Sequence, residues 1–210
     1  MSLRNTRINF ISIRSLLARH IVPISLTLAA LMIAIGGDTT AQLFQYQRNL
    51  ILDGEVWRLI TAHLVHLTWS HMLLNLAGLL LIWLLFGNYY ANKTWVVIVL
   101  ISCIGPGIGL LLFDPNLIWY VGLSGMLHGL FVAGCVAEIK LKQRGGWVLL
   151  AVICSKLTWE QFYGPLPGSA EAAGGDVIVD AHLYGALSGI LSLFLNLKNA
   201  RIKINNLSET

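Results

Sequence analysis

Charged residues are scarce in this sequence. Asp, Glu, Lys and Arg make up 11% of its 210 residues, whereas hydrophobic residues make up 56%. So few charges cannot cover the surface of a water-soluble domain, and the mean hydropathy of +0.72 excludes a disordered chain. We interpret the net charge of +4 as setting orientation in a membrane, and we expect no nucleic-acid partner. The composition therefore predicts a membrane protein whose surroundings are the lipid bilayer.

Cysteine is also rare. The chain has three cysteines, Cys103, Cys135 and Cys154, and all three lie in apolar stretches. An odd count inside apolar segments does not imply a disulfide framework, so we expect these residues to serve in packing.

Long apolar runs are abundant. A helix needs about 20 apolar residues to cross about 30 Å of hydrocarbon, and six runs approach that length. The fifth run is the weakest because it contains Lys156 and Glu160, which are spaced to pair on one helical face. The predicted spans are His20–Ile35, Leu67–Leu85, Trp95–Phe113, Trp119–Ile139, Trp147–Phe162 and Ala181–Leu197.

The basic residues fall mainly on one side of these spans. Most of the 14 Lys and Arg residues precede the first span or follow the second, fourth and sixth spans, which predicts that both termini are cytoplasmic. The first run follows a basic segment, as a secretory signal does, but no small-residue cleavage site follows it, so we expect a first transmembrane helix. The expected organisation is a basic cytoplasmic tail (1–19), a single six-helix membrane domain (20–197) and a cytoplasmic C-terminal tail (198–210).

A few polar residues interrupt the spans that run inward from the outer face. Because they lie near the starts of their spans, they should share a shallow depth beneath the outer surface. Intramembrane ionisable residues are costly and usually functional. These residues are His71 and Asn75 in the second span, Ser124 and His128 in the fourth, and His182 in the sixth.

Ser124 and His182 have the chemistry of a nucleophile and its base. Ser124 lies within Gly-Leu-Ser-Gly at the start of the fourth span, where unpaired backbone N–H groups suit a developing oxyanion. A serine hydroxyl needs a base at about 2.6 to 3.2 Å, and His182 is the natural candidate. The glycine pairs of these spans, Gly125/Gly129 and Gly185/Gly189, would let the two backbones approach closely.

His71 and Asn75 are four residues apart and therefore share a helical face. Both can donate hydrogen bonds, so together with the Ser124 backbone amide they would form an oxyanion hole. The alternative is a structural bond between helices, worth about 1 kcal/mol.

Taken together, these motifs resemble those of the rhomboid intramembrane serine proteases. The resemblance covers residues 55 to 190 in order, on the expected helices. The matching motifs are Glu55-x-Trp57-Arg58, His66, His71-x-x-x-Asn75, Gly122-x-Ser124-Gly125 and His182-x-x-Gly185-x-x-x-Gly189.

The resemblance implies an all-α, six-helix bundle that cleaves transmembrane protein substrates without cofactor or metal. Ser124 would be the nucleophile and His182 the base, while Gly122, Gly125 and His128 would line the site. Trp57, Arg58 and His66 would anchor the first outer loop, and the fifth span would act as a movable gate.

The chain departs from the pattern of many rhomboids at His128. They carry a tyrosine four residues after the serine, stacked on the catalytic histidine, whereas this chain has His128. An imidazole there either lines the cavity or bonds a backbone carbonyl, and it would alter the pH profile.

The residues around Ser124 and His182 resemble the rhombosortase branch. The similar segments are Gly-Leu-Ser-Gly-Met-Leu-His-Gly and Asp180-Ala181-His182-Leu183. This implies substrates with C-terminal Gly-Gly sorting tails, cleaved at the outer, periplasmic face of a bacterial inner membrane.

Two other function classes stay open. An inactive rhomboid-like protein would hold transmembrane clients in the same groove, although such proteins normally lack the nucleophile or the base. A metal-binding or transport protein would use the imidazoles of His63, His66, His71, His128 and His182, which suit zinc. Against it, the sequence places no carboxylate or cysteine at the same depth.

Overall fold

The structure is a computed structural model that describes residues 20–196. The two predicted tails, 1–19 and 198–210, lie outside the described residues. Within the described range, six helices have at least 15 residues, and each overlaps one predicted span. They are α2 (Ile21–Ile35), α6 (Trp69–Phe86), α7 (Asn92–Phe113), α8 (Ser124–Lys140), α9 (Arg144–Tyr163) and α11 (Val179–Asn196).

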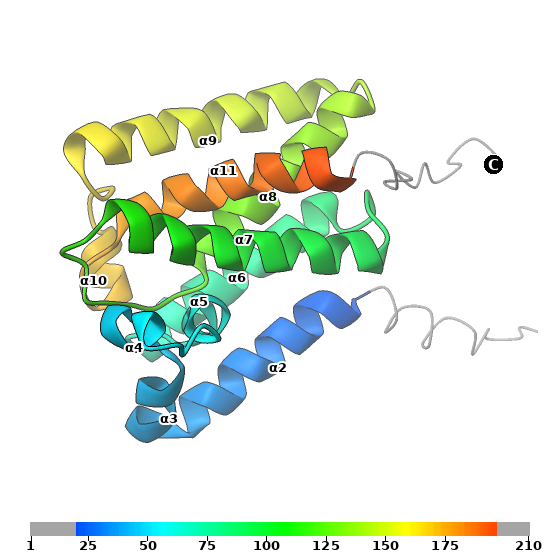
Figure 1. Cartoon of the computed structure of the whole chain (residues 1–210). Coiled ribbons are helices and arrows are strands. Elements are labelled where there is room, and N and C mark those ends of the chain that lie inside the picture. The colour runs from blue at the N-terminus through cyan, green and yellow to red at the C-terminus, as the bar shows by residue number, and fades with distance from the viewer. Residues whose placement is uncertain (1–19, 197–210) are drawn as a thin grey trace, which may run out of the picture.

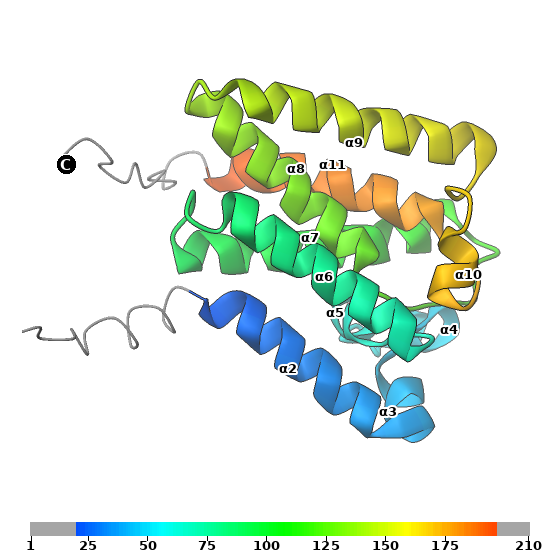
Figure 2. The same ribbon diagram turned by 180° about the vertical axis from the view of Figure 1, so that it is seen from behind.

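These long helices run between two ends of a bundle (Figures 1 and 2). The α6–α7 and α8–α9 turns lie at the end where α2 begins and α11 finishes, on the right of Figure 1. This is the arrangement expected for an even number of membrane spans. The short elements gather mainly at the opposite end: α3 (Gly37–Phe44), β1 (Tyr46–Gln47), α4 (Arg48–Leu52), α5 (Arg58–Thr61), η1 (Ala62–Leu64), β2 (Trp119–Tyr120) and α10 (Ser169–Ala173).

Two of the described helices, α6 and α7, are long and apolar enough by themselves to cross a membrane. Helix α2 is apolar but has only 15 residues. Helices α9 and α11 are longer, but they carry polar residues such as Lys156, Glu160 and His182, which lower their hydropathy. The fold is thus a helical bundle, and the count of six spans stays a prediction.

Helix α8 lies at the centre of the bundle and contacts α6, α7, α9 and α11. Its packing against α11 depends on glycine. A Cβ at Gly185 would collide with the Gly125 carbonyl, and one at Gly189 would collide with the Gly129 carbonyl. The helices therefore meet backbone to backbone, as the glycine spacing predicts.

The fourth span begins later than the sequence predicts. Trp119 and Tyr120 form β2, which pairs antiparallel with β1, and the helix starts only at Ser124. The intervening Gly122 has φ +120°, a left-handed conformation that breaks helical continuity. The apolar character of this stretch continues through the strand and the turn, so hydropathy alone could not locate the boundary.

Candidate active site

A fixed turn places Ser124 at the start of α8. The Gly122 N–H donates to the Ala62 carbonyl at 3.1 Å. The Gly122 carbonyl accepts from the Tyr120 hydroxyl at 2.9 Å and lies 3.1 Å from Nδ1 of the buried His63. Burial lowers the pKa of His63, because desolvation disfavours the imidazolium. The turn is therefore held from two sides, which fixes the direction of the serine that follows.

Ser124 and His182 meet across the α8–α11 contact. The Ser124 Oγ lies 3.0 Å from His182 Nε2, within the range for proton transfer from a nucleophile to its base. His182 lies in the first turns of α11, and only 5% of its surface is exposed. The close approach at Gly125 and Gly185 brings these two backbones near enough for the side chains to touch.

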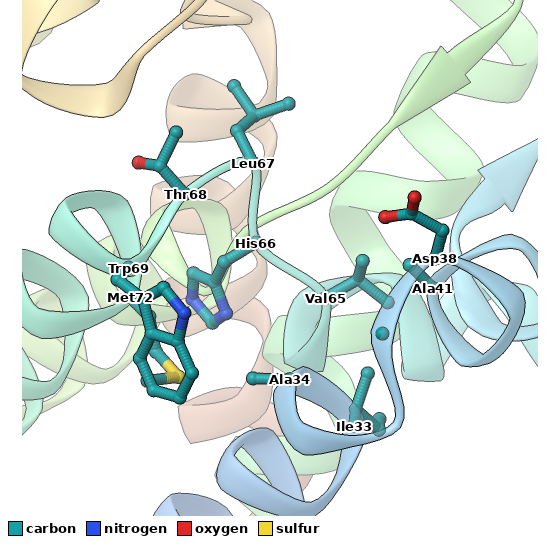
Figure 3. A pocket seen from close by; sticks show the side chains of 11 residues that line it. Ile33, Ala34, Asp38, Ala41, Val65, His66, Leu67, Thr68, Trp69 and Met72 are labelled. Carbon is teal, nitrogen blue, oxygen red and sulfur yellow. The ribbon is translucent and has the colours of Figure 1, made fainter.

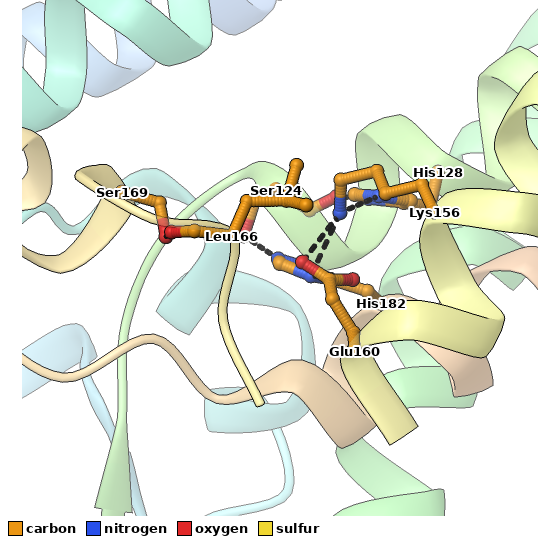
Figure 4. Close-up of polar contacts among 7 residues, drawn as sticks. All are labelled: Ser124, His128, Lys156, Glu160, Leu166, Ser169 and His182. Carbon is orange, nitrogen blue, oxygen red and sulfur yellow. Dashed lines mark hydrogen bonds and ion pairs between the residues drawn. The ribbon is translucent and has the colours of Figure 1, made fainter. Parts of the chain in front are cut away.

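The second nitrogen of His182 contacts a carboxylate from α9 (Figure 4). His182 Nδ1 lies 2.9 Å from Glu160 Oε2, and the other Glu160 oxygen lies 2.6 Å from Lys156 Nζ. The sequence predicted the pairing of Lys156 with Glu160, and the structure confirms it. It missed the contact with His182, although a buried carboxylate in an otherwise apolar helix was a usable signal.

His128 also belongs to this cluster. Its Nδ1 lies 2.7 Å from the Ser124 carbonyl, and its Nε2 lies 3.0 Å from Lys156 Nζ. The ring stacks on His182 with centroids 4.2 Å apart and planes 17° from parallel. Both alternatives from the sequence therefore hold, because His128 bonds a backbone carbonyl and lines the site.

His71 and Asn75 approach the same turn from α6. A Cβ on Gly122 would lie 2.9 Å from His71 Nε2 and 3.8 Å from Asn75 Nδ2, so both nitrogens are directed at this turn. His71 Nδ1 accepts from the Leu67 N–H at 3.4 Å, which leaves Nε2–H as the donor. Among the described residues, the buried Asn75 Nδ2 has no hydrogen-bond partner. Two unused donors beside a serine suit an oxyanion.

Comparison with known proteins assigns the family. The rhomboid domain matches residues 53–199, which is more than half of the chain. The chain belongs to the rhomboid family. Its relatives include proteins named rhomboid protease GlpG from Salmonella choleraesuis, Salmonella newport and Salmonella typhimurium, each 26% identical over 186 residues. The match covers 86% of this chain and 63% of each relative's length.

In this rhomboid, the long connection between α2 and α6 is fixed by Arg58, which is 3% exposed. Its Nε donates to Glu55 at 2.6 Å, and its Nη1 donates to the carbonyls of Gln42 and Gln45, each at 2.8 Å. Arg58 thereby ties α3 and the start of β1 to α5. Trp57 is 49% exposed and projects from the same loop.

His66 lies in the connection between η1 and α6. It lines a cavity of about 270 Å³ between α2, α3 and the start of α6, together with Asp38 and Met72 (Figure 3). Its ring contacts His71 edge to face at 5.1 Å. Neither ring nitrogen has a hydrogen-bond partner among the described residues. Burial, and then the neighbouring His71, lower the pKa of His66 to about 3.

Three residues of the rhomboid site could ligate a metal ion. Ligand atoms of His128, Glu160 and His182 all lie within 4.8 Å of one another, so the expectation that no carboxylate lies with the histidines is wrong. The Lys156 ammonium contacts each of them, at 3.0, 2.6 and 3.4 Å respectively. A metal ion would have to displace this ammonium, so the cluster as it stands is arranged around a lysine cation.

Proposed function

We propose that this protein is an intramembrane serine endopeptidase that hydrolyses peptide bonds in membrane-tethered proteins. The observation that carries the proposal is the 3.0 Å contact between Ser124 Oγ and His182 Nε2. Membership of the rhomboid family and the protease name of the Salmonella relatives support it. An inactive client-binding rhomboid would have no need for this pair.

The reaction follows from the positions of the groups. His182 Nε2 takes the Ser124 proton as Oγ attacks the scissile carbonyl carbon, and the carbonyl oxygen becomes an oxyanion. His71 Nε2–H, Asn75 Nδ2–H and the Ser124 backbone N–H donate to that oxyanion. When the intermediate collapses, the C–N bond breaks and His182 gives its proton to the leaving amine. Water, deprotonated by His182, then attacks the acyl carbon. The bond from that carbon to Ser124 Oγ breaks, and His182 returns the proton to Oγ.

A groove beside the site offers room for an extended polypeptide. A cavity of about 570 Å³ lies between the segment leading into α8 and the segment leading into α11. Tyr120 and Val121 form one wall, and Gly174, Asp176 and Ile178 contribute to the other. Cavities of about 300 to 1,000 Å³ hold drug-sized ligands, so this one has room for a few residues of a polypeptide. Because these segments end at Ser124 and near His182, a bound chain would pass beside the nucleophile.

We place the protein in a bacterial inner membrane, with both termini cytoplasmic and the site open to the periplasmic side. The substrates would be proteins with a transmembrane segment, including those with C-terminal Gly-Gly sorting tails. The resemblance of the segments around Ser124 and His182 to rhombosortases supports the proposal of Gly-Gly substrates. The proposal assigns no cofactor and no nucleic-acid partner.

Active-site labelling tests the proposed chemistry. We expect a fluorophosphonate probe to label the purified wild-type protein covalently, and we expect Ser124→Ala and His182→Ala to lose labelling and cleavage of a membrane-tethered substrate. Expression and thermal unfolding of each variant provide the control for folding. Cleavage by Ser124→Ala at the wild-type rate would reject the serine mechanism.

Substrate choice needs a separate experiment. Two membrane-tethered reporters would share one transmembrane helix and basic end and differ only in whether Gly-Gly or Leu-Leu precedes the helix. We expect the Gly-Gly reporter to be cleaved faster. Equal rates would leave the protease assignment standing and reject the sorting-tail substrates.

A further inference from the structure

We propose that Glu160 is a positioning residue for the reaction, and that Lys156 holds its carboxylate in place. Helix α9 would thereby convert the Ser124–His182 pair into a linked series of four side chains. This inference rests on the proposed protease function and extends it to residues of a third helix.

The distances connect the four groups in order. Ser124 Oγ lies 3.0 Å from His182 Nε2, and His182 Nδ1 lies 2.9 Å from Glu160 Oε2. The remaining carboxylate oxygen, Oε1, lies 2.6 Å from Lys156 Nζ. Each oxygen of Glu160 therefore has its own partner, and the carboxylate cannot rotate without losing one of them (Figure 4).

Burial makes the arrangement costly to disturb. The side chains of Glu160 and His182 are 2% and 6% exposed, whereas that of Lys156 is 26% exposed. A buried carboxylate is tolerated when it is paired and hydrogen-bonded, and removing one partner of such a pair is strongly destabilising. Lys156 can supply the compensating charge while its ammonium keeps some contact with the surroundings.

The partners also determine which ring nitrogens carry protons. An ionised carboxylate only accepts hydrogen bonds, so His182 Nδ1 must be the protonated nitrogen, which leaves Nε2 free to accept from Ser124. The Ser124 carbonyl likewise only accepts, so His128 Nδ1 is protonated and Nε2 accepts from Lys156. Without Glu160, the Lys156 ammonium at 3.4 Å would donate to His182 Nδ1 and favour the tautomer that cannot act as a base.

The negative charge of Glu160 has a second effect, which is on the protonated form of His182. When His182 takes the serine proton it becomes an imidazolium, which the carboxylate stabilises and the Lys156 ammonium opposes. The titratable groups packed around His182 are Glu160 and Lys156 from α9, His128 from α8 and His71 from α6. Among these groups Glu160 is the acidic one, so its replacement by an amide leaves the imidazolium facing only neutral or basic neighbours.

The test compares Glu160→Gln and Glu160→Asp in the full-length protein in proteoliposomes. For Glu160→Gln we expect kcat to fall about 100-fold or more, since loss of the acid that orients a catalytic histidine costs up to about 10⁴-fold in a serine protease. We also expect the acidic limb of its pH–rate profile to move to lower pH. Glu160→Asp keeps the charge and should recover part of the rate. Glu138→Gln is the matched control, because that carboxylate accepts from Tyr89 near the opposite end of α8.

Lys156→Met completes a double-mutant cycle. We expect this change alone to lower kcat less than Glu160→Gln does. The loss of activity in the double variant should be smaller than the product of the two single losses. The reason is that Lys156 donates to His182 Nδ1 only when Glu160 no longer accepts from it.

The outcomes separate this inference from the proposed function. Wild-type kcat, KM and pH profile in Glu160→Gln, alongside inactive Ser124→Ala and His182→Ala, would reject the role of Glu160 and leave the protease intact. A rate loss that matches the loss of folded protein, with no change in the pH profile, would show a merely structural role and also reject it. Full activity in Ser124→Ala would reject the proposed function itself.

Discussion

At the scale of single residues, His128 contacts the Ser124 carbonyl, the Lys156 ammonium and the His182 ring. It donates to the Ser124 carbonyl, accepts from Lys156 and stacks on His182 at 4.2 Å. The stacking face is the one that a tyrosine would supply in many relatives, according to the resemblance described above. The imidazole differs from a phenol in that its Nε2 accepts from the Lys156 ammonium next to His182.

His128→Tyr should therefore keep activity and change its pH dependence. The phenol ring offers the same stacking face but no protonatable nitrogen near His182. His128→Ala should lower stability by about 1 kcal/mol through loss of the aromatic contact. Cleavage rates between pH 5 and 9 and thermal unfolding would measure both effects, and an unchanged profile in His128→Tyr would show that the imidazole does not influence the pair.

The low pKa of His66 predicts that this residue contributes to the stability of the fold and that acid removes the contribution. Burial and His71 lower the pKa of His66 to about 3 in the folded protein. In the unfolded chain its pKa is about 6.5, so the unfolded chain binds the proton more tightly. This contribution is complete above about pH 6.5 and is lost progressively as pH falls toward 3. We expect the melting temperature in detergent to fall with pH in this window, and His66→Gln to reduce the slope. The same slope in both proteins would contradict this assignment.

At the scale of elements, the α8–α11 contact determines whether the reactive groups meet. The two helices touch through Gly125, Gly129, Gly185 and Gly189, and no side chain separates their backbones at these positions. The 3.0 Å distance between Ser124 and His182 depends on this approach.

Gly185→Val and Gly189→Val should force these helices apart. Each added side chain would meet a backbone carbonyl of α8, and overpacking of this kind typically costs about 1 to 3 kcal/mol. We expect lower thermal stability and a loss of labelling at Ser124. Leu187→Val is the control, because it introduces the same residue at an exposed position of α11. Normal turnover in both glycine variants would contradict the packing argument.

At the scale of the whole molecule, the ends of the bundle differ in charge. Lys93 and Arg144 lie in the first turns of α7 and α9, and Lys142 lies in the α8–α9 connection. These helix starts are at one end of the bundle (Figure 1). Acidic residues such as Asp53 and Glu171 belong to short segments at the other end. The positive-inside rule therefore predicts that the basic end faces the cytoplasm.

Cysteine labelling tests this orientation. In a variant whose native cysteines are replaced by alanine, Glu171→Cys should react with a membrane-impermeant maleimide in intact spheroplasts. Lys142→Cys should react only after the membrane is permeabilised. The reverse pattern would invert the predicted topology and place the candidate site on the cytoplasmic side.

The positions of the long helices and the principal candidates for chemistry could be predicted from the sequence alone. Apolar runs of membrane-spanning length are local properties of the chain, so five of the six spans were placed to within about four residues of the observed helices. Ser124 and His182 could be named because glycines flank them on their own helices. The pairing of Lys156 with Glu160 could be named because a spacing of four is likewise local.

Which helices bring their polar groups together depends on the three-dimensional packing and could not be predicted from the sequence. The contact of Glu160 with His182, the stacking of His128 and the late start of α8 all depend on how each helix is rotated and offset against its neighbours. Helices that are apolar on most faces carry no stripe from which that rotation can be predicted. Close backbone packing and buried charge pairing set it instead, and both involve residues far apart in the chain.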